Sequence, residues 1–377
     1  MKLAVSAEQT DLRDSVRRFL ADRAPMPRVR ELMETPDGTD RTVWQQAGTQ
    51  LGLQAIAIPE EYGGAGFGFA EQAIVLEEFG AALYGGPYLA SAVLAAAALL
   101  SAADERARRD LLPGIASGQT VATLAFTEDD GSWDPGAIRL TASRDAAGPG
   151  RDGWVLDGHK SFVLDGHTAD LILVVAEAEP GLSLFAVEAG AAGLHRQALP
   201  TLDQTRKLAR LEFASVPAAR LIGAPGEAGA VLARTLDVAA IALAAEQLGG
   251  AQRALDMAVG YAKTREQFGR AIGSFQAIKH RCADLLLEVE CLRSAVRYAA
   301  AAVAGDSAEV PVLAALTQAY ASDVFFHVAA ENIQIHGGIG FTWEHDAHLY
   351  FKRAKASELF LGDAAFHRER LAQRIGL

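Results

Sequence analysis

The chain has 377 residues, of which 50% are hydrophobic and 22% charged, and its formal net charge at pH 7 is −12. This length and composition exclude an intrinsically disordered chain and predict a globular protein of two or three subdomains. The negative charge argues against nucleic-acid binding, because a phosphate backbone requires a basic surface. The N-terminus lacks the pattern of a secretory signal, and the longest apolar stretch, 92–100, is too short to span a bilayer. We therefore expect a cytoplasmic protein that does not bind membranes.

Residues 1–117 are predicted to form an N-terminal helical domain. Ser6 and Gln9 fit a capping box that begins a helix with one apolar face. The Gly-rich stretch 59–66 interrupts the helices. It lacks the strand, turn and helix context of a nucleotide-binding loop, so we do not interpret it as one.

Residues 118–222 change from a helical to a strand-like period, which predicts a middle β-domain. Within 154–163, Asp157 and Gly158 separate two strand-like runs. This dipeptide accepts the positive backbone angles of a tight turn, so we expect a β-hairpin there. Further strands are predicted at 171–176 and 182–187.

Residues 223–377 are predicted to form a C-terminal bundle of about four long helices. Apolar residues recur at three- and four-residue spacing, which predicts one buried helix face. These residues are Leu248, Ala251, Leu255, Ala258 and Ala262. Ala-rich and Leu-rich helices of this kind pack closely and usually form antiparallel bundles.

The two cysteines, Cys282 and Cys291, lie nine residues apart on one predicted helix. That spacing is typical of neither a metal site nor a disulfide framework. We expect two reduced core residues and no metal.

The long helix that carries the apolar stripe ends near Gly269, and a second long helix starts at Ser274. Arg265, Gln267 and Phe268 therefore lie where two helices meet. A guanidinium matches phosphate oxygens, an amide offers paired hydrogen bonds, and an aromatic ring can cover a flat heterocycle. By itself, this combination also fits an exposed Arg and a core Phe at a helix end.

Three motifs occur together and in a recognisable order: Thr-Glu-x-x-Gly-Ser at 127–132, Arg-x-Gln-Phe-Gly at 265–269 and Gln-x-x-Gly-Gly-x-Gly at 334–340. In order and spacing the chain resembles the acyl-CoA dehydrogenase flavoproteins over nearly its whole length. The resemblance implies an N-terminal helical domain, a middle β-barrel-like domain and a C-terminal four-helix bundle. It also implies FAD as cofactor, a tetramer with the flavin between subunits, and an electron-transfer flavoprotein as electron acceptor.

The resemblance further implies which residues contact FAD. In the β-domain these are Thr127, Ser132 and Phe162. In the helical bundle they are Arg265, Gln267, Phe268, Ile272, Phe275, Gln334, Ile335, Gly337 and Gly338. Arg265 matches the family residue that binds the pyrophosphate of a neighbouring subunit's flavin.

The chain departs from the family where the catalytic base is expected. The family usually has a Glu before a Gly near the C-terminus, and the aligned residue here is Leu361. The family's alternative Glu position, on the long helix, also holds no Glu, and Ala240 replaces an Arg that often meets coenzyme A. Glu246 and Asp363 are the remaining carboxylate candidates. We rank Glu246 first, because an ionised side chain in an apolar helix is either functional or part of a structural ion pair.

Two functions follow from this pattern. The first is FAD-dependent α,β-dehydrogenation of an acyl-CoA thioester, from fatty-acid or sterol side-chain β-oxidation, to the trans-2-enoyl-CoA. The second is a non-catalytic partner subunit that completes the flavin site of a paralogue in a heterotetramer. Leu164, where the family commonly has a Thr, adds weight to the second. An oxidase or monooxygenase on the same fold and a ligand-free helical scaffold stay as further alternatives.

Overall fold

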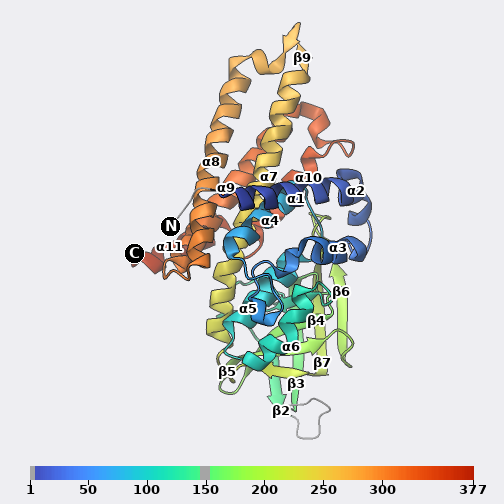
Figure 1. Cartoon of the computed structure of the whole chain (residues 1–377), viewed down its shortest axis with the longest axis vertical. Coiled ribbons are helices and arrows are strands. Elements are labelled where there is room, and N and C mark those ends of the chain that lie inside the picture. Colours follow the sequence, from blue (N-terminus) through green and yellow to red (C-terminus); the bar gives the residue numbers. More distant parts are fainter. Residues whose placement is uncertain (1–4, 145–152) are drawn as a thin grey trace. The chain divides into compact units, whose positions relative to one another are not determined.

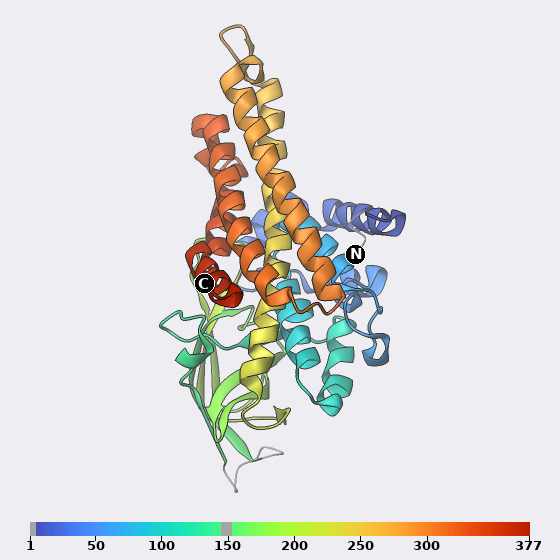
Figure 2. The ribbon, with the colours of Figure 1, turned by 90° about the vertical axis from the view of Figure 1, so that its left-hand side faces the viewer.

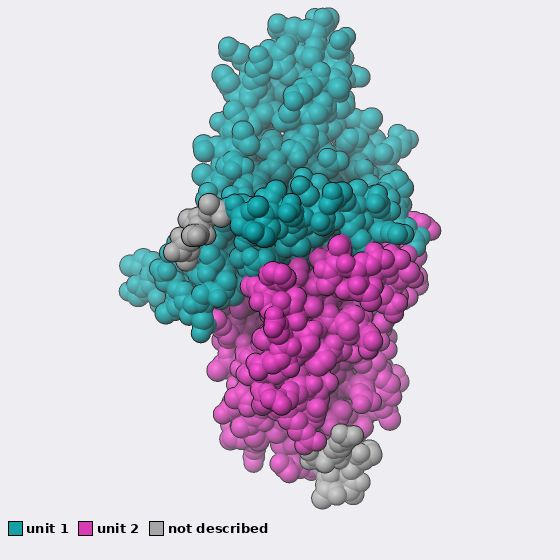
Figure 3. Space-filling view, in the orientation of Figure 1, with its two compact units in different colours: residues 1–30, 69–84, 240–377 teal, residues 31–68, 85–239 magenta. Residues whose placement is uncertain are grey.

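The computed structural model of the protein describes residues 5–144 and 153–377. The chain divides into two compact units, which are coloured separately in Figure 3. The helical unit comprises residues 1–30, 69–84 and 240–377, and the sheet unit comprises residues 31–68 and 85–239. Each unit is described by itself.

The helical unit is built mainly from long helices of the C-terminal part of the chain. They are the C-terminal part of α7 (Ala228–Thr264), α8 (Gln276–Ala304), α9 (Val310–His336), α10 (Ala347–Leu359) and α11 (Ala364–Ile375). Helices α7 and α8 run side by side and meet at a tip formed by β9 (Glu266–Gln267) and β10 (Arg270–Ala271), as both views show (Figures 1 and 2). The predicted apolar stripe is confirmed, because all five of its residues are buried.

The N-terminal part of the chain adds α1 (Ala7–Arg23), most of α2 (Met26–Met33) and α4 (Phe69–Ala81) to this unit. The predicted capping box is present at the start of α1, with Ser6 and Gln9 bonded reciprocally. Helix α4 crosses α7 at backbone contact distance. A Cβ atom added at Gly249 would lie 1.7 Å from the carbonyl oxygen of Glu77, so only glycine permits this crossing.

The sheet unit holds one eight-stranded sheet with the order β6, β7, β3, β2, β4, β5, β8, and β1 pairs in parallel with β4. The strands are β1 (Ala122–Ala125), β2 (Thr141–Arg144), β3 (Trp154–Leu164), β4 (Leu171–Ala178), β5 (Gly181–Glu188), β6 (Leu194–Leu199), β7 (Leu208–Pro217) and β8 (Arg220–Ile222). The unit also contains α3 (Arg41–Leu51), the π-helix η3 (Leu89–Ala95), α5 (Ala96–Ser101) and α6 (Glu105–Ala116). The predicted succession of helical, β and helical segments is confirmed.

The predicted hairpin at Asp157 and Gly158 is wrong. Both residues lie inside the single strand β3, and the runs on either side of them pair with the same neighbour, β7. The positive φ of Gly158, 133°, accompanies a register shift in the ladder, so the dipeptide forms a β-bulge. The Asp157 carboxylate accepts a hydrogen bond from the backbone N–H of Ser215 on β7, at 2.7 Å, which holds the bulge in the sheet.

The expectation for the cysteines is partly wrong. Both thiols are free, but Cys291 is exposed on α8 and Cys282 is only half-buried. Burial raises the pKa of the Cys282 thiol. Helices α7 and α9 are long and apolar enough to span a membrane by composition, but most of each apolar segment is buried in the fold, as is typical of core helices.

Candidate functional site

The segment around Arg265 forms a small β-hairpin between α7 and α8. Helix α7 ends at Thr264, and β9 and β10 then pair with Gln267 opposite Arg270. Phe268 (φ 55°) and Gly269 (φ 73°) make the turn, as expected of a two-residue hairpin whose central positions need positive φ. The predicted location of this motif, where two helices meet, is confirmed.

The side chains of this hairpin point away from the core. Phe268 is 91% exposed, and Arg265 and Gln267 are also exposed. Among the described residues, no ion pair involves Arg265. Phe275 contacts Phe268 edge to face, with 6.2 Å between ring centroids. A hairpin that presents both an exposed guanidinium and aromatic rings suits an anionic ligand that carries a flat ring system.

The glycine turn follows the end of α9 and lies beside this hairpin. Ile335 is buried against Ala258 and Ala262 of α7, and Ile272, at the base of the hairpin, packs against the same cluster. Gln334 is exposed at the end of α9. The helical unit therefore brings two of the three sequence motifs together.

Gly337 and Gly338 leave open space beside the backbone. Gly337 has φ 66° and ψ −147°, a conformation that essentially only glycine adopts. A Cβ atom at either position would meet nothing within 4 Å in this chain. Internal packing in this chain therefore does not require a glycine at 338.

The third motif lies in the sheet unit, next to Phe162. The Thr127 hydroxyl donates to the Ser161 carbonyl oxygen at 2.6 Å, and the Ser161 N–H donates to the Thr127 carbonyl oxygen at 2.9 Å. A Cβ atom at Gly131 would lie 3.7 Å from the Phe162 ring. Ser132 follows directly, and its hydroxyl accepts from the backbone of Asp134. The loop that carries Thr127 and Ser132 thus lies against the part of β3 that carries Phe162.

Phe162 is 37% exposed and has φ 58°, within a register shift between β3 and β7. A positive φ at an aromatic residue is strained, and such strain concentrates at functional positions. Leu164, two residues further on, is buried and lacks the side-chain oxygen of the family's Thr. Phe162 is therefore partly exposed, whereas Leu164 has no hydroxyl group that could donate a hydrogen bond.

A buried ion pair fixes the loop that carries Thr127. The Lys160 ammonium is fully buried and donates to the Glu128 carboxylate at 2.9 Å and to the Phe126 carbonyl oxygen at 3.1 Å. The same carboxylate oxygen accepts from the backbone N–H groups of Arg139 and Leu140. Burial lowers the pKa of Lys160 to about 8 although Glu128 opposes that shift. Sequence reasoning missed this pair, because Lys160 and Glu128 are 32 residues apart in the chain.

Glu246, the first candidate for the base, is engaged in a buried ion pair. Its carboxylate accepts from the Arg353 guanidinium at 2.9 Å, and the two side chains are 9% and 3% exposed. The pair joins α7 to α10 inside the helical unit. This geometry is the structural alternative that the sequence left open, and the sequence did not indicate Arg353 as its partner.

Replacing Glu246 with Gln is expected to lower the free energy of unfolding by about 3–5 kcal/mol, because an ion pair between two buried side chains would be broken. Urea denaturation of the purified chain measures this change. The double variant Glu246→Met, Arg353→Leu should recover most of the stability, since apolar residues of similar volume often replace a buried pair without loss. A single variant as stable as the natural chain would show that the pair contributes little.

Asp363 and Leu361 lie at the start of α11. The Asp363 carboxylate accepts from the backbone N–H of Phe366 at 2.8 Å, which makes it the N-cap of that helix. Leu361 is buried, with φ 65°, and its carbonyl oxygen bonds to the ring of His367. Burial lowers the pKa of His367 to about 4. Within the described part of the chain, the residue in the family's usual base position is thus an apolar side chain.

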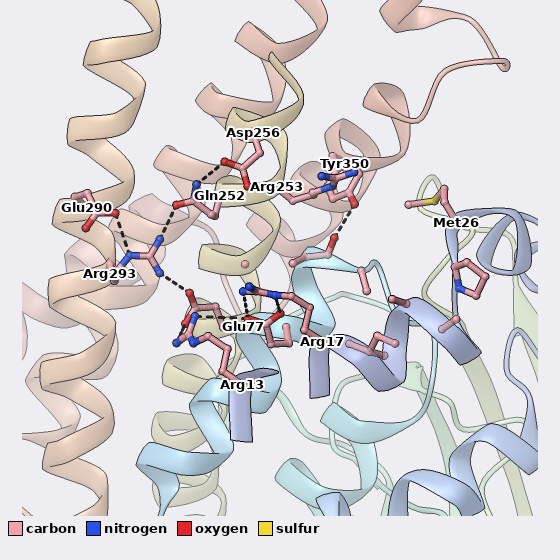
Figure 4. Close-up of a pocket in the computed structure, with 18 residues that line it drawn as sticks. Arg13, Arg17, Met26, Glu77, Gln252, Arg253, Asp256, Glu290, Arg293 and Tyr350 are labelled. Carbon is pink, nitrogen blue, oxygen red and sulfur yellow. Dashed lines mark hydrogen bonds and ion pairs between the residues drawn. The ribbon is translucent and has the colours of Figure 1, made fainter. Parts of the chain in front are cut away.

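A cavity of about 900 Å³ opens between α1, α4, α7, α8 and α10 of the helical unit (Figure 4). Its wall carries charged side chains that pair with each other: Arg13 donates to Glu77 at 2.8 Å, and Arg17 donates two bonds to Glu78 at 2.9 and 3.0 Å. Glu246 is not among its lining residues. We assign this cavity no part in the candidate site.

Comparison with known proteins identifies the family. The models of the acyl-CoA dehydrogenase N-terminal, middle and C-terminal domains match residues 6–119, 123–216 and 228–376. The acyl-CoA dehydrogenase IpdE2 of Mycobacterium tuberculosis is 38% identical over 94% of this chain and 93% of its own length. The chain belongs to the acyl-CoA dehydrogenase family. The resemblance drawn from the three motifs is thereby confirmed, and the acyl-CoA dehydrogenase fold with it.

Solved structures of acyl-CoA dehydrogenases agree with this assignment. The ChsE4-ChsE5 complex of Mycobacterium tuberculosis contains a chain with a TM-score of 0.89 and 31% identity, which covers 100% of this chain and 99% of its own. A variant of the Tcur3481-Tcur3483 steroid ACAD has a TM-score of 0.88 and 34% identity, with 99% of both chains covered. As a member of the acyl-CoA dehydrogenase family, the chain is an oxidoreductase.

Proposed function

We propose that this chain is one subunit of a heteromeric acyl-CoA dehydrogenase, in which a paralogous subunit supplies the carboxylate that removes the α-proton. The assembly oxidises an acyl-CoA thioester to the trans-2-enoyl-CoA. One observation carries the proposal: Glu246 is held in a buried ion pair, Asp363 caps a helix, and the family's base position is Leu361. The Glu246 carboxylate is bonded to the buried Arg353 guanidinium at 2.9 Å, so that its place in the fold supports a structural role.

FAD is the proposed cofactor, and it would supply the acceptor for the β-hydride. The exposed Arg265 would bind its pyrophosphate, and the glycine turn would let backbone approach the same ligand. Five more residues on or next to the hairpin and the glycine turn are proposed as FAD contacts: Gln267, Phe268, Ile272, Phe275 and Gln334. Those of them that are exposed suit contact with a flavin held by a neighbouring subunit. Thr127, Ser132 and Phe162 are proposed as contacts on the sheet unit.

The glycine turn offers a direct test of this placement. Gly338→Ala should leave the unfolding free energy unchanged, because a Cβ atom there meets nothing in this chain, yet it should weaken FAD binding to the assembled protein. Gly337→Ala is the matched comparison and should destabilise the chain by about 1–3 kcal/mol, because of its backbone conformation. Unfolding curves and FAD titrations of both variants measure the two effects. Undiminished FAD binding by the Gly338→Ala complex would argue against a ligand at this turn.

The other parts of the proposal rest on the family. A heterotetramer is supported by similarity to chains of the ChsE4-ChsE5 and Tcur3481-Tcur3483 structures, each of which names two components. We propose a fatty or steroid-derived acyl-CoA as substrate, an electron-transfer flavoprotein as acceptor, and the cytoplasm as location. Co-expression with candidate paralogues tests the assembly: a stable complex that contains FAD supports it, and a chain that forms an FAD-loaded homotetramer would favour the self-sufficient enzyme.

A further inference from the structure

The ring of His336 contacts two other rings close to the hairpin and the glycine turn. His336 is the last residue of α9, directly before Gly337, and it is 6% exposed. It stacks on Tyr261, with ring centroids 4.3 Å apart and planes 29° apart. It also contacts the ring of His345, with centroids 4.3 Å apart and planes tilted by 50°. The end of α7, the end of α9 and the stretch after the glycine turn therefore meet at this imidazole.

Tyr261 ties the stack to the hairpin. Its carbonyl oxygen accepts from the Arg265 N–H at 2.8 Å, and the Arg265 carbonyl oxygen accepts from the Ile272 N–H at 2.8 Å. Tyr261 and Ile272 also pack on the cluster that contains Ile335, the residue before His336. A shift of the Tyr261 ring would therefore move the backbone that carries Arg265.

His345 ties the stack to the segment after the glycine turn. Its Nδ1 accepts from the Ala347 N–H at 3.1 Å, and its carbonyl oxygen accepts from the Arg30 guanidinium at 3.0 Å. Arg30 also pairs with Asp346 at 2.8 Å. His345 is thus held by hydrogen bonds to α2 and α10, and its ring contacts the His336 ring.

A hydrogen bond to the backbone fixes the orientation of the His336 ring. His336 Nδ1 lies 2.8 Å from the Asn332 carbonyl oxygen, which can only accept, so Nδ1 carries the proton. Burial lowers the pKa of His336, the hydrogen bond to Asn332 opposes this shift, and His345 adds to it. A stacked ring pair adds stabilisation beyond the burial of its surface.

We propose that His336 is a positioning residue: by stacking on Tyr261 and contacting His345, it fixes the hairpin of Arg265 against the glycine turn, so that both elements face the flavin of the neighbouring subunit as one surface. The part of this inference that concerns FAD binding rests on the proposed function. The positioning of the hairpin against the glycine turn depends on this chain alone. The two parts are tested by separate measurements.

The positioning is tested by hydrogen exchange on the full chain alone. His336→Ala should speed amide exchange across 265–275 and 337–342, because both segments lose their common support. His336→Phe keeps a ring and should leave that exchange slow. His367→Ala is the matched control, since His367 is also buried in the helical unit but bonds to Leu361. Equal exchange of these segments in the His336→Ala and His367→Ala variants would overturn the proposal.

The consequence for the ligand is tested by FAD titration of the complex with the unlike subunit. His336→Ala should weaken FAD binding about two- to tenfold and alter the visible circular dichroism of the bound flavin, whereas His336→Phe should restore both. A His336→Phe complex as weak as His336→Ala would overturn the role of ring stacking. A natural complex that binds no FAD, together with the expected exchange pattern, would instead refute the proposed function and leave the positioning standing.

Discussion

Replacing the catalytic carboxylate of the unlike subunit with its amide is expected to slow flavin reduction by about 10²- to 10⁴-fold, the range that a positioned general base contributes. In the same complex, Glu246→Gln and Asp363→Asn in this chain should leave the reduction rate unchanged. Glu246 is bonded to Arg353 and Asp363 caps α11, so we expect both carboxylates to have structural roles in this chain. Stopped-flow reduction of the flavin by an acyl-CoA, under anaerobic conditions, measures all three rates.

The rates must be compared per folded and flavin-loaded complex, because Glu246→Gln is expected to reduce stability. Temperatures well below the unfolding transition and a flavin count for each preparation separate the two effects. Asp363→Asn serves as the milder control, since an Asn also functions as an N-cap. A loss of about 10²-fold or more on changing Glu246 alone, with the fold intact, would make Glu246 the base and this chain self-sufficient.

Arg265→Ala is expected to weaken FAD binding to the complex by at least about thirtyfold, because truncating one member of a desolvated charge pair costs about 2–5 kcal/mol. The guanidinium is exposed in the isolated chain, so the unfolding free energy should hardly change. Fluorescence titration of the flavin-free complex with FAD gives the affinity, and urea denaturation gives the stability.

Lys263→Ala is the matched control for Arg265. Lys263 is an exposed cation in the last turn of α7, two residues before Arg265, so its removal changes the net charge equally. FAD binding by the Lys263→Ala complex should match that of the natural complex. Equal effects of both variants would mean that Arg265 acts through general charge and makes no specific bond to the pyrophosphate.

Local sequence patterns correctly predicted the structural features that depend only on residues close together in the sequence. The period of α7, the capping box at Ser6 and the helix break before Ser274 are all set by residues within a few positions of each other. The motif around Arg265 also specifies its own hairpin, since Phe268 and Gly269 adopt the positive φ of a two-residue turn.

Contacts between distant residues could not be read from the sequence. Glu246 and Arg353 are 107 residues apart, and only the packing of α7 against α10 brings them together. Asp157 and Gly158 suited a hairpin equally well, but pairing of the whole strand with β7 made them a bulge instead. Tertiary context also decided which face of α8 is covered, and it left Cys291 outside the core.

The most direct test of the central claim is the anaerobic visible spectrum of the purified chain, with FAD and a panel of fatty and steroid-derived acyl-CoAs, recorded alone and with the paralogous subunit. We predict that flavin bleaching occurs only when the unlike subunit is present, because this chain lacks a free carboxylate in either family position for the base. Bleaching by the chain alone, which is lost in Glu246→Gln, would contradict that account and establish a self-sufficient dehydrogenase.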